Sequence, residues 1–141
     1  MVALGLVGPG LAGPAHADPD PTWFRSPTGN IVCDIRPGDD VPYLRCDVKD
    51  PTFTPPPAPP IHTRFCGQGP WGRSLQMSRD EPAHFQCISD TVFKDGLPVL
   101  AYGTETTRYG FRCASATDGI TCTDQGTGRG FRLARDSYAI F

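Results

Sequence analysis

The sequence predicts an all-β fold, a small antiparallel barrel or sandwich of short strands stapled by three disulfides. Three observations lead to this prediction. Short apolar or alternating segments are separated by turn signals, and no segment keeps a 3.6-residue apolar period over two turns. The 16 glycines and 16 prolines among 141 residues leave little room for long helices. The six cysteines form an even set, which is typical of disulfide frameworks in small secreted domains.

Strands are expected wherever such a run lies between turn residues. The expected segments are residues 31–35, 43–48, 71–77, 83–88, 91–93, 98–102, 109–115, 120–123 and 131–134. Residues 71–77 also fit a helical turn. Trp23 and Phe24 are expected to pack in the core before the first of these strands. The closing hydrophobic residues are Tyr138, Ile140 and Phe141.

Turns between these segments are marked by Gly, Pro, Asn and Asp. Ser26-Pro27-Thr28-Gly29-Asn30 precedes the first hairpin, and Thr117-Asp118-Gly119 joins two strands near the end of the chain. Residues 50–60 contain six prolines. We expect a polyproline II connector there, because Pro cannot donate the backbone hydrogen bond that a central strand needs. A P-x-x-P register in the same run also fits an SH3-type ligand.

The first 17 residues are expected to be a signal peptide. Residues 1–14 carry no charged side chain, and Ala15-His16-Ala17 fits the small-residue cleavage pattern, so cleavage is expected before Asp18. The basic residues that usually begin a signal peptide are missing, and we therefore expect the true start codon to lie upstream of Met1. The segment is too short and too often broken by Gly and Pro to span a bilayer. Residues 18–141 are predicted to form a single secreted β domain with the Pro-rich connector at 51–60.

Sequential pairing of the cysteines is predicted, because each pair brackets a plausible turn. The predicted pairs are Cys33–Cys46, Cys66–Cys87 and Cys113–Cys122. Antiparallel folding of residues 31–35 onto 43–48 places the first pair directly opposite each other, within disulfide range. Each bridge closes a loop that is worth about 3 kcal/mol in the chain-entropy model. Zinc binding is the alternative for these cysteines, but the chain has no C-x-x-C pair, and neither a metal nor a cofactor is predicted.

No catalytic residue is predicted. His62 and His84 are the histidines that follow the expected cleavage site, and no serine lies in a G-x-S-x-G elbow. Paired carboxylates for glycoside hydrolysis are the other possibility. The candidates are Asp34, Asp47, Asp90, Asp118 and Asp124. Two of them, Asp34 and Asp47, directly follow a strand cysteine and are therefore expected on the opposite, solvated face.

Two further features could bind a ligand. Gly126 to Gly130 is glycine-rich and contains Arg129, which could hold an anion, but no helix or G-K-[ST] motif follows and a hairpin turn is the favoured interpretation. Exposed aromatic side chains on a β scaffold can bind sugars or peptides, although a core position is the default for most of them. The aromatic candidates are Trp23, Tyr43, Trp71, Tyr102 and Tyr109.

Three motifs resemble a family of small secreted actinobacterial proteins of mycobacterial type. They are Ser26-Pro27-Thr28-Gly29-Asn30-Ile31-x-Cys33, Gly119-Ile120-Thr121-Cys122, and Thr127-Gly128-Arg129-Gly130-Phe131-x-Leu133-Ala134-Arg135-x-x-Tyr138. The family shares an S-P-[ST]-G-N-I-x-C opening and a T-G-x-G-F-x-L-[SA]-R close, and the resemblance covers nearly all of residues 23–141. It implies secretion and disulfides, and because the family has no known function it supplies no catalytic residues.

The sequence therefore predicts a secreted or cell-envelope-associated, non-catalytic β domain that acts as a binding or structural module. The alternative is a small secreted hydrolase or a protease- or lysozyme-type inhibitor. The expected partner is an envelope component or an extracellular protein. With 13 basic against 15 acidic residues the chain is too balanced for a nucleic-acid binder that relies on a basic surface. No transmembrane segment is expected in the mature chain.

Overall fold

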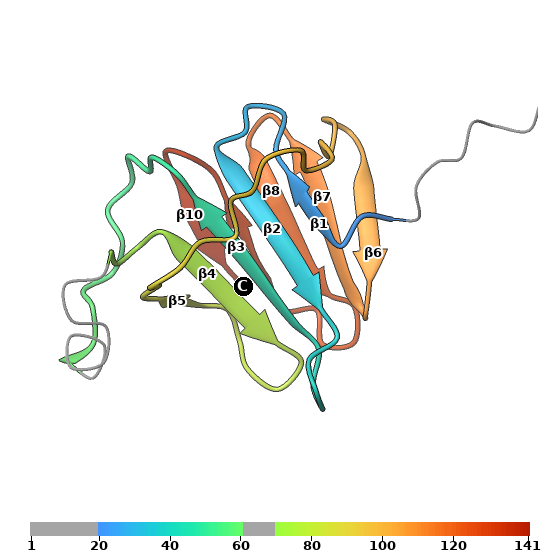
Figure 1. The fold of residues 1–141 in the computed structure, drawn as a ribbon. Coiled ribbons are helices and arrows are strands. Elements are labelled where there is room, and N and C mark those ends of the chain that lie inside the picture. The colour runs from blue at the N-terminus through green and yellow to red at the C-terminus, as the bar shows by residue number, and fades with distance from the viewer. Residues whose placement is uncertain (1–19, 61–69) are drawn as a thin grey trace, which may run out of the picture.

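A computed structural model of the chain describes residues 20–60 and 70–141 (Figure 1). Its strands are β1 (Trp23–Arg25), β2 (Ile31–Arg36), β3 (Tyr43–Val48), β4 (Ser74–Ser78), β5 (His84–Gln86), β6 (Glu105–Arg108), β7 (Phe111–Ala116), β8 (Gly119–Asp124), β9 (Gly130–Leu133) and β10 (Tyr138–Ile140). They form two five-stranded antiparallel sheets. Sheet A has the order β1-β2-β3-β4-β5 and sheet B the order β10-β9-β8-β7-β6. Each sheet is a meander, in which consecutive strands are hydrogen-bonded neighbours.

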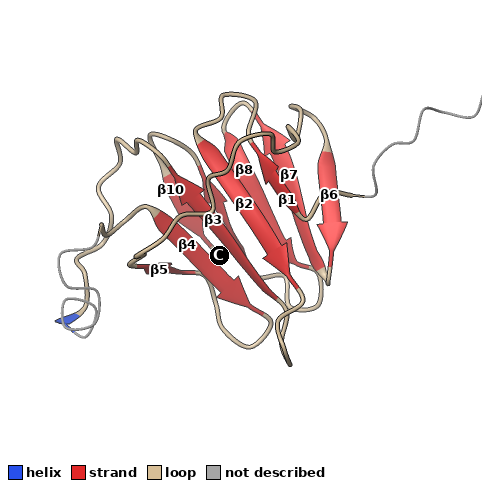
Figure 2. Ribbon diagram, viewed as in Figure 1, coloured by secondary structure: helices blue, strands red, loops and turns tan. Residues whose placement is uncertain are grey.

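The two sheets lie face to face and do not close into a barrel, so the fold is a sandwich (Figure 2). Of the two architectures that the sequence left open, the barrel is wrong. Apolar side chains from both sheets meet in one core, which contains the fully buried Phe24 of β1, Leu75 of β4, Phe111 of β7 and Phe131 of β9. Burying these faces against each other is the main favourable contribution to folding.

Two disulfides lie at the centre of this core, one in each sheet. Cys33 of β2 is bonded to Cys46 of β3, and Cys113 of β7 to Cys122 of β8. Within each pair the two cysteines are direct cross-strand partners, with Cα atoms 4.1 Å apart. The structure describes these two bridges rather than the three that we expected. Cys66 lies outside the described residues, so its pairing with Cys87 stays a prediction.

Most strand predictions from the first and last thirds of the chain are confirmed. Residues 43–48 coincide with β3, and the segments at 31–35, 120–123 and 131–134 fall within β2, β8 and β9 or shift by one residue from them. Residues 71–77 fit a strand or a helical turn, and the structure has β4 there with Leu75 and Met77 buried. The alternation expected for β7 also holds, because its first, third and fifth residues are buried and the others are not.

Two predicted strands are wrong, and three strands, β1, β6 and β10, were not predicted as strands. Residues 91–93 and 98–102 form no strand, and the second segment makes one isolated parallel bridge, Arg25 to Val99. Their backbone groups bond instead to side chains and to single carbonyls, as in Val92 N–H to Asp47 Oδ2 at 3.1 Å. The missed strand β6 has the polar sequence Glu-Thr-Thr-Arg, in which Thr106 alone is fully buried. A polar edge strand gives little apolar signal.

The Pro-rich connector packs on the segment that leads into β4. The Trp71 indole N–H donates to the Pro56 carbonyl at 2.7 Å. Gly72 has a φ of +82°, and a Cβ there would lie 2.5 Å from the Pro55 ring, so this close approach requires glycine. At the other end of the chain, Tyr138 packs against the core as predicted. Ile140 and Phe141 do not, because their exposed fractions are 43% and 52%.

A long connection between β5 and β6 crosses the outer face of sheet A (Figure 1). We call residues 88–100 of this connection the strap. Val92 and Leu97 of the strap form a small apolar cluster with Val32 of β2, and Trp23 and Phe93 pack against it. The strap ends beside β1, where Leu100 N–H donates to the Arg25 carbonyl at 2.9 Å. Sheet A therefore has side chains packed against both of its faces.

Candidate functional site

A network of ion pairs on the outer face of sheet A holds the strap in place. Arg45 of β3 donates from Nε and Nη2 to the two carboxylate oxygens of Asp47, each at 2.8 Å. Its Nη1 donates to the carboxylate of Asp90 in the strap, also at 2.8 Å. The same Asp47 carboxylate accepts the Val92 N–H. One bidentate arginine therefore connects a strand carboxylate to the strap, which is the strong form of this interaction.

The exposure predicted for two aspartates is wrong. Asp34 and Asp47 do point away from the disulfide and the core, as their position after a cysteine requires. They are not solvated, because their exposed fractions are 5% and 1%. The strap covers this face, and each carboxylate is neutralised by an arginine, Asp34 by Arg36 at 2.6 Å.

This network also shifts the ionisation of its members. Burial lowers the pKa of Arg45, but its hydrogen bonds to Asp47 and Asp90 outweigh that effect, and the net shift is upward. The hydrogen bond from Arg45 and its positive charge lower the pKa of Asp90 below the ordinary value of 3.8. Both groups are therefore charged at neutral pH, and the strap is attached by an ionised pair.

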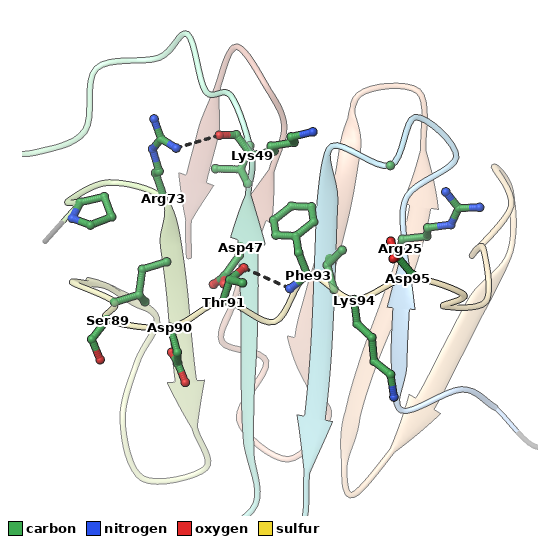
Figure 3. Close-up of a pocket in the computed structure, with 15 residues that line it drawn as sticks. Arg25, Asp47, Lys49, Arg73, Ser89, Asp90, Thr91, Phe93, Lys94 and Asp95 are labelled. Carbon is green, nitrogen blue, oxygen red and sulfur yellow. Dashed lines mark hydrogen bonds between the residues drawn. The ribbon is translucent and has the colours of Figure 1, made fainter.

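Two grooves flank the strap on this face. The larger one, which we call the strap groove, has a volume of about 700 Å³. Figure 3 shows it between the strap, the ends of β2 and β3, and the segment before β4. The Phe93 ring stands among the lining residues, and four basic and three acidic side chains line the groove. Its volume lies within the range of ordinary ligand sites.

The basic side chains of the strap groove have few internal partners. Arg73 donates to the Lys49 carbonyl at 3.1 Å, and Arg25 donates from Nε to the Leu97 carbonyl at 3.3 Å (Figure 3 shows the first). Among the described residues neither arginine forms an ion pair, and nor does Lys49. By contrast, Asp47 and Asp90 both pair with Arg45, which balances one of their two negative charges. The groove therefore presents uncompensated positive charge in a chain whose net charge is −2.

The second groove, which we call the aromatic groove, lies on the other side of the strap and has a volume of about 520 Å³. Its lining combines two aromatic side chains with planar polar side chains on neighbouring strands. The lining residues used below are Trp23, Asp34, Arg36, Tyr43, Arg45 and Gln76. Tyr43 is 39% exposed. The Trp23 indole N–H donates to the Val92 carbonyl at 2.9 Å, which fixes the ring beside the strap.

The histidines and aspartates considered for catalysis form no acid–base pair in the part of the chain that the structure describes. His84 is near the edge of sheet A, where its ring nitrogens contact the Pro82 carbonyl and the Gln86 amide rather than a carboxylate. His62 lies outside the described residues. Asp34, Asp47 and Asp90 do gather on the outer face of sheet A, but arginines hold all three in ion pairs. Asp118 and Asp124 lie at opposite ends of β8, far along the strand from each other.

The glycine-rich turn is a hairpin corner, as predicted. Gly126 N–H donates to the Asp124 carboxylate at 2.8 Å, and Gly128 N–H donates to the Asp124 carbonyl at 2.8 Å. Arg129 N–H donates to the Thr127 hydroxyl at 3.2 Å. Because these donors are used within the turn, they are not available to hold an anion.

The aromatic candidates separate into two groups. Trp23 and Tyr43 line the aromatic groove, whereas Tyr102 and Tyr109 are exposed elsewhere. Trp71 packs at the edge of the core, with its ring centroid 6.2 Å from that of Phe85. Sequence reasoning did not single out the basic residues of the strap groove. Their charges were visible, but no local pattern indicates that Arg25, Lys49 and Arg73 lie at one groove.

A small sulfur cluster lies in the core. The sulfur atoms of Cys33, Cys46 and Cys122 lie within 4.8 Å of one another, and all three are disulfide-bonded. Disulfide sulfurs are not thiolates and do not ligate zinc. The proximity shows that the bridges of sheets A and B pack against each other across the sandwich. In the part of the chain that the structure describes, no helix is long and apolar enough to cross a bilayer.

The fold and its outer face define a two-sheet antiparallel β sandwich with a strapped, groove-bearing sheet. The chain belongs to a family of unknown function, DUF6636, whose model matches residues 5–141. No curated protein and no solved structure matches the chain.

Proposed function

We propose that this protein is a secreted or envelope-associated, non-catalytic binding module, which binds an anionic envelope component in the strap groove. The expected signal peptide at residues 1–17 and the disulfides in the core support an extracellular location. The resemblance to secreted actinobacterial proteins supports the same location. In this proposal residues 18–141 form the mature domain.

The observation that carries this proposal is the positive charge at the strap groove. Arg25, Lys49 and Arg73 line it without an ion-pair partner among the described residues, while two of the three acidic groups already pair with Arg45. Carboxylate and phosphate groups pair with arginine through charge-assisted hydrogen bonds. The Phe93 ring adds an apolar surface for the part of the ligand that bears the anion.

The alternative functions have less support. A hydrolase needs a base oriented by an acid, and among the described residues the ring nitrogens of His84 contact the Pro82 carbonyl and the Gln86 amide instead. An inhibitor would present a rigid protruding loop and would not need a groove. Two grooves on one sheet face favour a binding module over both.

Retention of the oxidised mature domain on isolated cell-envelope material tests the proposal. The double variant Lys49→Glu/Arg73→Glu should lower retention at least about tenfold, because each charge-assisted hydrogen bond lost costs more than a neutral one. Retention of the parent should also fall as NaCl is raised. Arg129→Glu is the matched control, since its side chain is exposed on the β8–β9 turn. Equal retention of all three proteins, or no retention of any, would reject the proposal.

Mass spectrometry of the secreted protein tests the location separately. The expected N-terminal residue is Asp18, after cleavage that follows Ala17. An intact N-terminus on protein that stays inside the cell would contradict secretion. This result would leave the groove and its ligand class to be judged on the binding data.

A further inference from the structure

The aromatic groove lies on a row of side chains that crosses sheet A. The strand register places Trp23 opposite Asp34, Asp34 opposite Arg45, and Arg45 opposite Gln76. All four therefore project from the same face of four neighbouring strands. A second pair, Arg36 opposite Tyr43, lies two residues further along β2 and β3. Six of the nine lining residues are thus on strands, which fixes the positions of their side chains, and the other three belong to the strap.

The charges in this groove cancel. Asp34 pairs with Arg36 at 2.6 Å, and Arg45 pairs with Asp90 at 2.8 Å, so each charged lining residue has an opposite partner. The strap groove differs, because Arg25, Lys49 and Arg73 have none among the described residues. A charged ligand in the aromatic groove would have to break an existing pair, which a neutral ligand does not require.

Several hydrogen-bonding groups in the groove remain available. The Gln76 side-chain amide has no partner among the described residues and can both donate and accept. Arg36 uses its Nε for Asp34, which leaves its two Nη groups for a ligand. These groups are planar and are held by the sheet and by ion pairs. They suit a ligand with many hydroxyl groups, since each hydroxyl can donate and accept.

Two aromatic rings bound the same groove. Tyr43 on β3 is 39% exposed, and Trp23 on β1 is fixed by its hydrogen bond to Val92. Lys94 Nζ and Arg36 Cζ lie over the Trp23 ring, 4.8 Å and 5.8 Å from its centroid, so these cations already occupy ring surface there and Tyr43 is the ring available for stacking. A pyranose ring has an apolar C–H face that packs on an aromatic ring, while its edge carries hydroxyl groups. We propose that the aromatic groove binds an uncharged saccharide, at a site separate from the strap groove.

Isothermal titration calorimetry of the oxidised mature domain with maltotriose, cellotriose, chitotriose and mannotriose tests this assignment. At least one should bind with a Kd of about 1 mM or tighter. Tyr43→Ala and Gln76→Ala should each weaken that binding about three- to tenfold, because each removes one ring contact or one amide contact. Tyr109→Ala is the matched control, since it removes a tyrosine that is 43% exposed away from the groove. Near-ultraviolet circular dichroism checks that each variant is folded.

The outcomes separate the two sites. Lys49→Glu/Arg73→Glu should leave saccharide binding unchanged, and Tyr43→Ala should leave envelope retention through the strap groove unchanged. Absence of binding by all four saccharides would overturn the saccharide site and leave the strap groove untouched. Equal loss of saccharide binding in Tyr43→Ala and Tyr109→Ala would also overturn it.

Discussion

Arg45 and Asp47 show how single residues organise the outer face of sheet A. Asp47 is 1% exposed, and its carboxylate receives two hydrogen bonds from Arg45 and one from the Val92 backbone. A charge so deeply buried is tolerated because both carboxylate oxygens accept hydrogen bonds from the protein and one of the donors is a cation. The sequence showed that Asp47 points away from the core. It could not show the burial, because the covering residues are more than 40 positions away.

Replacing Asp47 by Ala should lower the free energy of unfolding by about 3–5 kcal/mol. The substitution leaves the partly buried Arg45 without its main partner and frees the Val92 N–H. Urea denaturation followed by fluorescence measures the change. Asp39→Ala is the control, because Asp39 is exposed in the β2–β3 loop and should change stability by less than about 0.5 kcal/mol. Similar losses in the two variants would show that the network does not stabilise the fold.

At the scale of elements, the strands and the strap differ in how well the sequence predicts them. β3, β7 and β8 carry alternating patterns and turn signals of their own, so local reasoning finds them. The strap contains the apolar residues Val92, Phe93 and Leu97, and this apolar pattern is also typical of a buried strand. At Val92 its backbone bonds to the Asp47 and Trp23 side chains of sheet A, and it meets the backbone of β1 at one isolated bridge, Val99 to Arg25. A pattern of apolar residues cannot show whether backbone groups will form hydrogen bonds with a neighbouring strand or with side chains.

The ion pair between Asp90 and Arg45 makes strap attachment sensitive to acid. The pKa of Asp90 is lowered in the folded protein, so its contribution is present above the ordinary value of 3.8 and is lost as pH falls through the folded pKa. The parent should therefore be more stable than Asp90→Asn at pH 7, and the two should converge below about pH 3. The difference should be small and should shrink with added NaCl, because the Asp90 side chain is 77% exposed.

Urea midpoints measured from pH 7 to pH 2 provide this comparison. Asp95→Asn is the control, since it removes a strap carboxylate that has no ion pair among the described residues. A stability difference between the parent and the Asp90→Asn variant that stays constant across the whole range would contradict a role for the ionised pair.

At the scale of the whole molecule, two disulfides stabilise the sandwich. Cys33–Cys46 joins two strands of sheet A, and Cys113–Cys122 joins two strands of sheet B. Each closes a short hairpin, with sequence separations of 13 and 9 residues. Their sulfur atoms also meet between the sheets, within 4.8 Å for Cys33, Cys46 and Cys122. Each bridge stabilises its own hairpin, because it reduces the conformational entropy of the unfolded chain. The two bridges also stabilise the sandwich, because they pack against each other between the sheets.

A double-mutant cycle on the two bridges should detect this contact. Removing either pair as Cys→Ala should cost about 3 kcal/mol. Removing both should cost less than the sum by at least about 0.5 kcal/mol, because their mutual contact is lost in each single-pair variant and cannot be lost twice. Urea denaturation of the three variants measures this. Strict additivity would show that the bridges act independently.

Thiol counting on the oxidised protein checks the third predicted bridge, and more than one free thiol would contradict it.

Local sequence was enough to predict the all-β class, the β2–β3, β7–β8 and β8–β9 hairpins, and the pairing of Cys33 with Cys46 and of Cys113 with Cys122, because these depend on residues close along the chain. The choice of a sandwich over a barrel came from tertiary structure, since it depends on how two meanders pack. The two grooves also depend on tertiary structure. Trp23, Tyr43 and Gln76 lie on separate strands. The strap that lies between the two grooves is held on sheet A by a hydrogen bond to the buried Asp47 carboxylate. Contacts between residues so far apart in sequence leave no local pattern to read.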